Sequence, residues 1–77
     1  MPPILEADLR RYLAAGLIRG ISVLRTSGGW LLQVQMGTET AGLRRQRGGE
    51  RIFKSLDKLA DFIGELGLER FDVQLRN

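Results

Sequence analysis

Two stretches of the chain place apolar residues at the spacing of one face of an α-helix. The first predicts a helix over residues 4–15, from Leu5, Leu9, Tyr12 and Leu13. The second predicts a helix over residues 56–66, from Leu56, Leu59, Phe62, Ile63 and Leu66. Ser55 directly precedes the second stretch and suits the N-cap position. Gly16 and Gly67 follow the two stretches, and glycine at that position commonly ends a helix in the left-handed conformation.

Elsewhere the apolar residues alternate with polar ones, as in a β-strand. Residues 20–26 and 29–36 alternate in this way around a Ser-Gly-Gly turn, which predicts a β-hairpin. Residues 41–47 and 70–75 predict two further strands, and a glycine pair ends the first of these. The sequence therefore predicts four strands and two helices in the order α-β-β-β-α-β.

These elements indicate a single small α+β domain over residues 1–77, with a mostly antiparallel four-stranded sheet covered by two helices. A right-handed crossover through the second helix makes the last strand parallel to the first and favours the order 3-2-1-4, although a place beside the third strand stays open. In the favoured order, strand 41–47 lies at an edge. The predicted core contains Leu9, Leu13, Ile21, Val23, Trp30, Leu32, Val34, Leu59, Phe62, Ile63, Leu66, Phe71 and Val73.

The composition limits the chemistry of the chain more than it limits the fold. Its 77 residues include no cysteine and no histidine, which excludes disulfides, thiolate or imidazole metal sites, and Cys or His catalysis. We therefore expect no enzyme and no cofactor. The first twenty residues carry five charges and the chain has no run of about 20 apolar residues, so we expect a cytoplasmic protein without membrane contact.

Positive charge is concentrated in one segment. The net charge is +3, but residues 44–54 alone carry +4, which leaves the rest of the chain at −1. Arginine forks suit phosphate oxygens and guanine edges, and a glycine pair lets backbone amides approach a phosphate closely. The predicted nucleic-acid-binding residues are Arg44, Arg45, Arg47, Gly48, Gly49, Arg51 and Lys54.

The same charges have a second explanation, because charge on an exposed edge strand prevents edge-to-edge aggregation. Protein contact is a third. A chain this short also forms only a thin core, and exposed strand edges offer a way to extend it, so a homodimer is slightly favoured.

Three other patterns have simpler structural explanations. Ser55 and Lys58 match a Ser-x-x-Lys pattern of acyl-enzymes, but an N-cap role accounts for the serine. The acidic residues of the second helix form a stripe that suits a solvated face better than a cation site: Asp57, Asp61 and Glu65. Trp30 could stack on bases, but core burial explains it better.

Several short segments together carry a family resemblance. They are Trp30-Leu31-Leu32-Gln33-Val34, Leu43 through Arg51, Phe53-Lys54-Ser55-Leu56-Asp57, Gly67-Leu68 and Phe71-Asp72-Val73. With these segments the chain resembles the ParC-type partition-associated proteins of plasmids and integrated conjugative elements, which are unrelated to the topoisomerase subunit of that name. The resemblance implies an accessory role in inheritance of a mobile element, with DNA or a protein of the partition machinery as partner. It supplies no catalytic motif.

Two functions are therefore open. The first is a non-enzymatic nucleic-acid-binding accessory protein, with DNA favoured over RNA, linked to plasmid partition or maintenance. The second is a protein–protein adaptor or self-associating module without direct contact to nucleic acid. The sequence alone does not decide between them.

Overall fold

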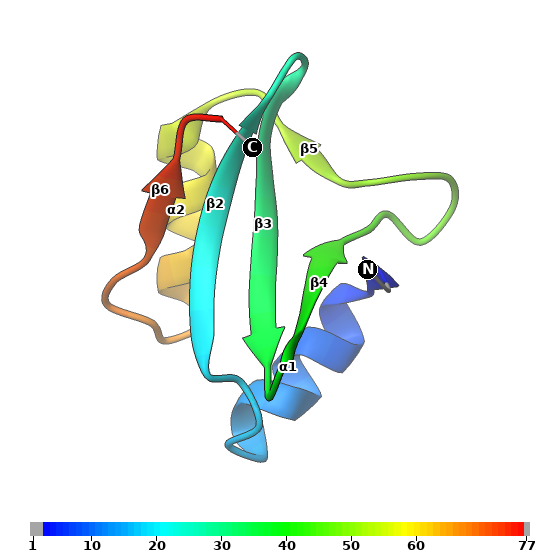
Figure 1. The fold of residues 1–77 in the computed structure, drawn as a ribbon, viewed down its shortest axis with the longest axis vertical. Coiled ribbons are helices and arrows are strands. Elements are labelled where there is room, and N and C mark those ends of the chain that lie inside the picture. The colour runs from blue at the N-terminus through cyan, green and yellow to red at the C-terminus, as the bar shows by residue number, and fades with distance from the viewer. Residues whose placement is uncertain (1–2, 77) are drawn as a thin grey trace.

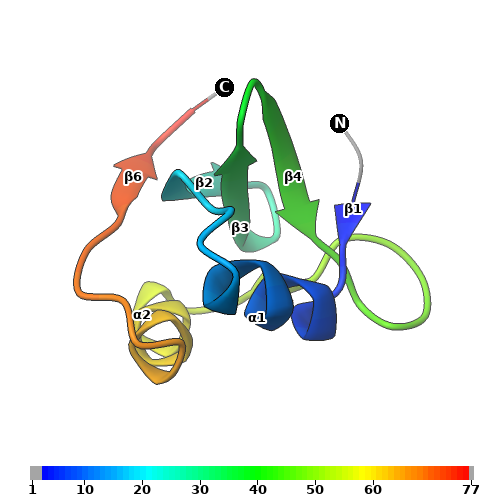
Figure 2. The same ribbon diagram turned by 90° about the horizontal axis from the view of Figure 1, so that it is seen from below.

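One sheet with two helices on the same face makes up the fold (Figures 1 and 2). The computed structural model describes residues 3–76. Along the chain its elements are β1 (Pro3–Ile4), α1 (Glu6–Ala14), β2 (Gly20–Thr26), β3 (Gly29–Met36), β4 (Glu39–Leu43), β5 (Ile52–Phe53), α2 (Leu56–Glu65) and β6 (Asp72–Gln74). The predicted α+β class with two helices is confirmed.

The sheet is mixed and has six short strands, where the sequence predicted four mostly antiparallel ones. Its order is β1-β4-β3-β2-β6, and β5 also pairs with β3. β2, β3 and β4 form an antiparallel meander, while β6 lies parallel to β2 and β1 lies parallel to β4. The meander and β6 follow the favoured order 3-2-1-4. The addition of β1 means that β4 is not the edge strand that the sequence indicated.

The first residues of the chain differ from the prediction because Ile4 extends the sheet instead of starting a helix. Ile4 pairs with Leu43 of β4 and is buried, and α1 begins two residues later at Glu6. The N-cap position of α2 is as predicted, because the Ser55 hydroxyl accepts a hydrogen bond of 3.1 Å from the backbone N–H of Lys58. None of the helices described between residues 3 and 76 is long and apolar enough to cross a bilayer.

The core lies between the helices and the face of the sheet that they cover (Figure 2). Its buried residues are Ile4, Leu9, Ile21, Val23, Leu32, Val34, Ala41, Leu43, Leu59, Phe62 and Ile63. Leu13, Trp30, Leu66 and Phe71 are partly buried against this cluster, so these four members of the predicted core lie at its periphery.

Val73 was predicted in the core, and that prediction is wrong. It pairs with the buried Val23, but it remains 42 % exposed because β6 is the last strand of the sheet on its side. The prediction also missed Leu24 and Leu31, which pair with each other and are buried on the face opposite the helices. A Cβ at Gly42 would lie 3.6 Å from a methyl carbon of Leu31, so the backbone of β4 packs closely against this side chain on the second face.

Truncation of Leu32 should cost far more stability than truncation of Val73. Leu32 is 0 % exposed on the central strand, so Leu32→Ala should lower the free energy of unfolding by about 2–5 kcal/mol. Val73→Ala should lower it by less than about 1 kcal/mol. Urea denaturation followed by the fluorescence of Trp30, the one tryptophan, measures both. Equal losses would show that β6 is packed as tightly as β3.

Candidate functional site

The predicted basic segment is a loop, which we call the arginine loop and define as residues 44–51 (Figure 1). β4 ends at Leu43, so the predicted strand 41–47 is too long and its arginines do not alternate between the faces of a sheet. An antiparallel bridge between Arg44 and Glu50 closes the base of the loop. The backbone N–H of Arg45 donates to the carbonyl of Gly49 at 3.0 Å, which closes it further.

The arginine loop interrupts what is otherwise one continuous row of pairing along β3. β4 pairs with β3 as far as Gly42 opposite Gln33, and β5 resumes with Ile52 opposite Leu31. The chain therefore leaves the sheet and returns to β3 two residues further along, with Leu32 between the two pairs. The loop therefore projects from the sheet between β4 and β5, two strands that pair with the same side of β3.

Arg51 holds the loop against both helices. Its Nη1 donates to Glu6 Oε1 of α1 at 2.8 Å, and its guanidinium lies 5.0 Å from the ring centre of Phe53 and 4.9 Å from that of Phe62. The centres of the two rings lie 5.5 Å apart. An arginine over two aromatic faces and beside a carboxylate has a structural role, because both contacts require a fixed guanidinium.

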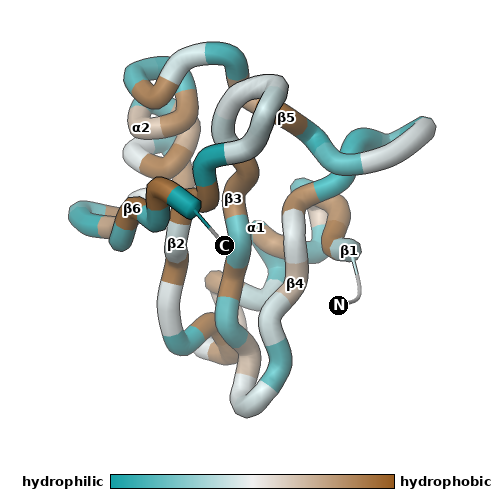
Figure 3. The backbone as a smooth tube through the Cα atoms, turned by 45° about the horizontal axis from the view of Figure 1, so that its top comes forward, coloured by the Kyte–Doolittle hydropathy of each residue, from teal (hydrophilic) through white to brown (hydrophobic). Residues whose placement is uncertain are grey.

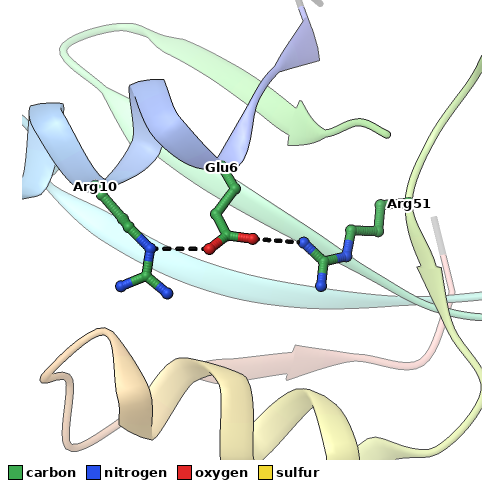
Figure 4. A network of polar contacts seen from close by, with 3 residues as sticks. All are labelled: Glu6, Arg10 and Arg51. Carbon is green, nitrogen blue, oxygen red and sulfur yellow. Dashed lines mark hydrogen bonds and ion pairs between the residues drawn. The ribbon is translucent and has the colours of Figure 1, made fainter. Parts of the chain in front are cut away.

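Glu6 joins Arg51 to a second arginine (Figure 4). Its Oε2 accepts a hydrogen bond of 2.9 Å from Nε of Arg10, one turn further along α1. Hydrogen bonds from Arg51 and then from Arg10 hold the pKa of the Glu6 carboxyl below its usual value. The carboxylate therefore stays ionised in acid longer than a free glutamate would.

The other cations of the segment are held less firmly. Arg44 is half-buried, and its guanidinium donates to the carbonyl oxygens of Arg45 and Gln46 at 3.2 and 3.3 Å, so it braces the loop from inside. Arg45 and Arg47 are exposed, and Lys54 is exposed beyond β5. Figure 3 shows that the loop is hydrophilic except at its glycines.

The backbone conformation explains why one residue of the glycine pair is glycine. Gly48 has φ +95°, in the left-handed region that side chains rarely adopt, and a Cβ there would lie 3.1 Å from Nη2 of Arg45. Gly49 has no such restriction. The pair thus turns the chain and leaves room for the Arg45 side chain.

Two clefts border the arginine loop. The larger, of about 530 Å³, separates the loop from the start of α1 and is lined by Leu5, Glu6, Ala7, Arg10, Arg44, Arg45, Gln46 and Arg51. We call it the arginine cleft. The smaller, of about 260 Å³, is lined by Pro3, Gly42, Arg44, Gly48, Gly49 and Glu50. Three of the predicted arginines thus meet in the arginine cleft, whereas Arg47 and Lys54 line neither.

Sequence reasoning missed Glu6 and Arg10 as members of this site. Their i, i+4 spacing is visible in the sequence and predicts an ion pair on a helix surface. Their approach to Arg51, 45 residues from Glu6, depends on how α1 lies against the sheet. No local pattern carries that information.

The other residues that the sequence singled out either pack against the core or lie exposed on α2. Trp30 is half-buried and packs against the core. Asp57, Asp61 and Glu65 are exposed along α2. In the part of the chain from residue 3 to 76, no three carboxylates come together in an arrangement that could hold a metal ion.

Comparison with known proteins identifies the family. The sequence profile of the ParC-like family matches residues 4–77, so the chain belongs to the ParC-like family, as the resemblance of its segments indicated. No curated protein and no solved structure matches the chain.

Removal of Arg51 should destabilise the fold, whereas removal of Arg47 should not. Arg51→Ala loses the contacts with two aromatic rings and the ion pair to Glu6, which together correspond to about 1–2 kcal/mol. Arg47→Ala should change the free energy of unfolding by less than about 0.5 kcal/mol. Urea denaturation of both variants measures the difference, and an Arg51→Ala variant as stable as the wild type would contradict the structural role.

Glu6 should make stability depend on pH in the acid range. Its pKa is lower in the folded than in the unfolded chain, so its contribution is complete above its usual value of 4.5 and is lost as pH falls through the lowered pKa. In that window the unfolded state binds more protons, and the free energy of unfolding rises with pH. Glu6→Gln should therefore flatten the dependence of stability on pH in the acid range below about pH 5.

The matched variant is Arg51→Met, which removes the principal donor but keeps apolar volume beside the rings. This variant should flatten the pH dependence of stability over the same acid range. The double variant with Glu6→Gln should show a dependence only slightly flatter still. Denaturant titrations at a series of pH values test this. An unchanged slope in Glu6→Gln would show that another carboxylate controls acid stability.

Proposed function

We propose that the protein is a non-enzymatic accessory protein of a plasmid or related mobile element and that it binds nucleic acid, DNA by preference, through the arginine loop. The observation that carries the proposal is a set of cations without carboxylate partners. Within residues 3–76, the three ion pairs use Arg10, Arg11 and Arg51. The arginine loop therefore holds three arginines without ion pairs: the exposed Arg45 and Arg47, and the half-buried Arg44, which donates to loop carbonyls.

The chemistry of these side chains suits a phosphate backbone. A guanidinium donates two parallel N–H groups to a phosphate, and exposed arginines reach successive phosphates without reading the bases. Lys54 adds one more cation beyond β5. Up to about four such contacts give affinity that falls with salt at a log-log slope of about −3 to −4 on duplex DNA. The link to partition or maintenance of a mobile element rests on membership of the ParC-like family.

A second candidate function is protein contact, which the free edge of β6 favours. Among the described residues 3–76, β6 pairs only with β2, and the exposed large apolar residues include Val73 at 42 % and Leu75 at 64 %, both at this edge. An edge strand with apolar neighbours can add a strand from a partition protein or from a second copy of the chain. The predicted homodimer remains a prediction, and sedimentation equilibrium at tens of micromolar tests it.

Loss of two exposed arginines should weaken binding in a salt-dependent way. Arg45→Ala with Arg47→Ala removes two phosphate contacts and should reduce the log-log salt slope on duplex DNA by about 2. The fold should remain intact, because both side chains are exposed. Fluorescence anisotropy with a labelled duplex, between about 20 and 200 mM salt, measures the slope.

The matched control is Arg19→Ala with Arg70→Ala. It removes the same charge from two exposed arginines that border a separate cleft between the starts of β2 and β6. The control should bind with nearly the slope of the wild type. Equal slopes for the two double variants, or no wild-type binding at about 20 mM salt, would contradict the proposal and favour protein contact.

A further inference from the structure

The arginine cleft concentrates positive charge in a concave site. Four arginines and one glutamate line it, which leaves a formal charge of +3 around about 530 Å³. Its volume is in the range of ligand-binding sites. The arginines come from two regions of the chain, Arg10 from α1 and the others from the arginine loop, so they surround the cleft from two sides.

An anionic group already occupies part of this cleft, namely the Glu6 carboxylate. It accepts one N–H from Arg10 and one from Arg51 (Figure 4). A guanidinium has five N–H groups, so both arginines keep donors for a second acceptor. Glu6 thus positions two arginines for an anion and at the same time repels that anion.

We propose that the arginine cleft binds a terminal phosphate group, a monoester that carries close to two negative charges. The proposal rests on the proposed function and specifies which part of a nucleic acid the cleft takes. A terminal phosphate leaves three oxygens free for several guanidinium forks. A bridging phosphodiester carries one charge and must lead two strand segments out of the cleft, so it suits the exposed Arg47 at the loop surface instead.

Glu6 should therefore oppose ligand binding. Glu6→Gln keeps an acceptor oxygen for the arginines and removes the repulsion of the phosphate. Because the Glu6 side chain is 38 % exposed, solvent screens part of this repulsion, and removal of the charge should raise affinity roughly tenfold at low salt. The matched control is Asp8→Asn on the same helix, which changes net charge equally but lies outside the cleft, in an ion pair with Arg11.

The experiment compares one single-stranded oligonucleotide with a 5′-phosphate and with a 5′-hydroxyl, and adds inorganic phosphate as a third probe. Each oligonucleotide carries a fluorescent label at its 3′ end, and anisotropy measures its affinity for the full-length chain. The NMR shifts of the arginine Nε–Hε groups report binding of inorganic phosphate in the cleft. The 5′-phosphate form should bind about tenfold more tightly than the hydroxyl form. Glu6→Gln should strengthen its binding a further tenfold or so, Asp8→Asn by less than about twofold, and Arg10→Ala should reduce the preference for the phosphate.

Each other outcome has a distinct meaning. Equal binding of both oligonucleotides, still dependent on Arg45 and Arg47, overturns the terminal-phosphate site and leaves the proposed function standing. Binding of inorganic phosphate in the cleft without binding of either oligonucleotide overturns both the monoester proposal and the proposed function, since free phosphate is then the ligand. If no probe shifts the Arg10 and Arg51 signals, or if Asp8→Asn matches Glu6→Gln, the cleft proposal is wrong.

Discussion

The guanidinium of Arg51 connects the arginine loop to both helices and to β5. It contacts Glu6 of α1, Phe53 of β5 and Phe62 of α2 while belonging to the arginine loop. A domain of this size buries a smaller share of its unfolded surface than a larger domain does, so contacts that reach across several elements matter more to its stability. The arginine loop is consequently fixed at its end by the contacts that also fix the two helices relative to the sheet.

This arrangement divides the basic residues by role. Arg44 and Arg51 are bound to carbonyl oxygens or to a carboxylate, and they shape the loop. Arg45 and Arg47 lie at its surface and are available to a ligand. A cluster that looks uniform in the sequence is thus part framework and part exposed surface, and mutations within it should not be interpreted as equivalent losses of charge.

The spacing of apolar residues predicted the elements in which that spacing covers most of the strand or helix. The β2–β3 hairpin and α2 follow from partial alternation or helical spacing with a marked turn or cap, such as Ser55. The sequence could not predict β1, because two residues have no period and Ile4 is placed by its pairing with Leu43. Burial of Leu24 and Leu31 was also beyond local pattern, since it depends on which residues cross the second face of the sheet.

For the candidate site, local sequence found the cations but not their partners. The charge cluster was evident, whereas Glu6 and Arg10 join it only through tertiary packing. The error in the strand 41–47 has the same origin, because no glycine or proline follows Leu43 before Gly48, so nothing in the local sequence ends the strand at Leu43. Pairing with β3, rather than propensity, decides where β4 stops and β5 begins.

The interrupted ladder has a consequence for how such a protein can change over time. Gly42 and Ile52 face nearly adjacent positions of β3, so the ends of the excursion are held close together whatever lies between them. The entropy of closing a loop grows only slowly with its length. Insertions, deletions or exchanges at the tip therefore leave the register of the sheet untouched. The tip is therefore the part of this scaffold whose length and sequence can vary while the hydrophobic core stays the same.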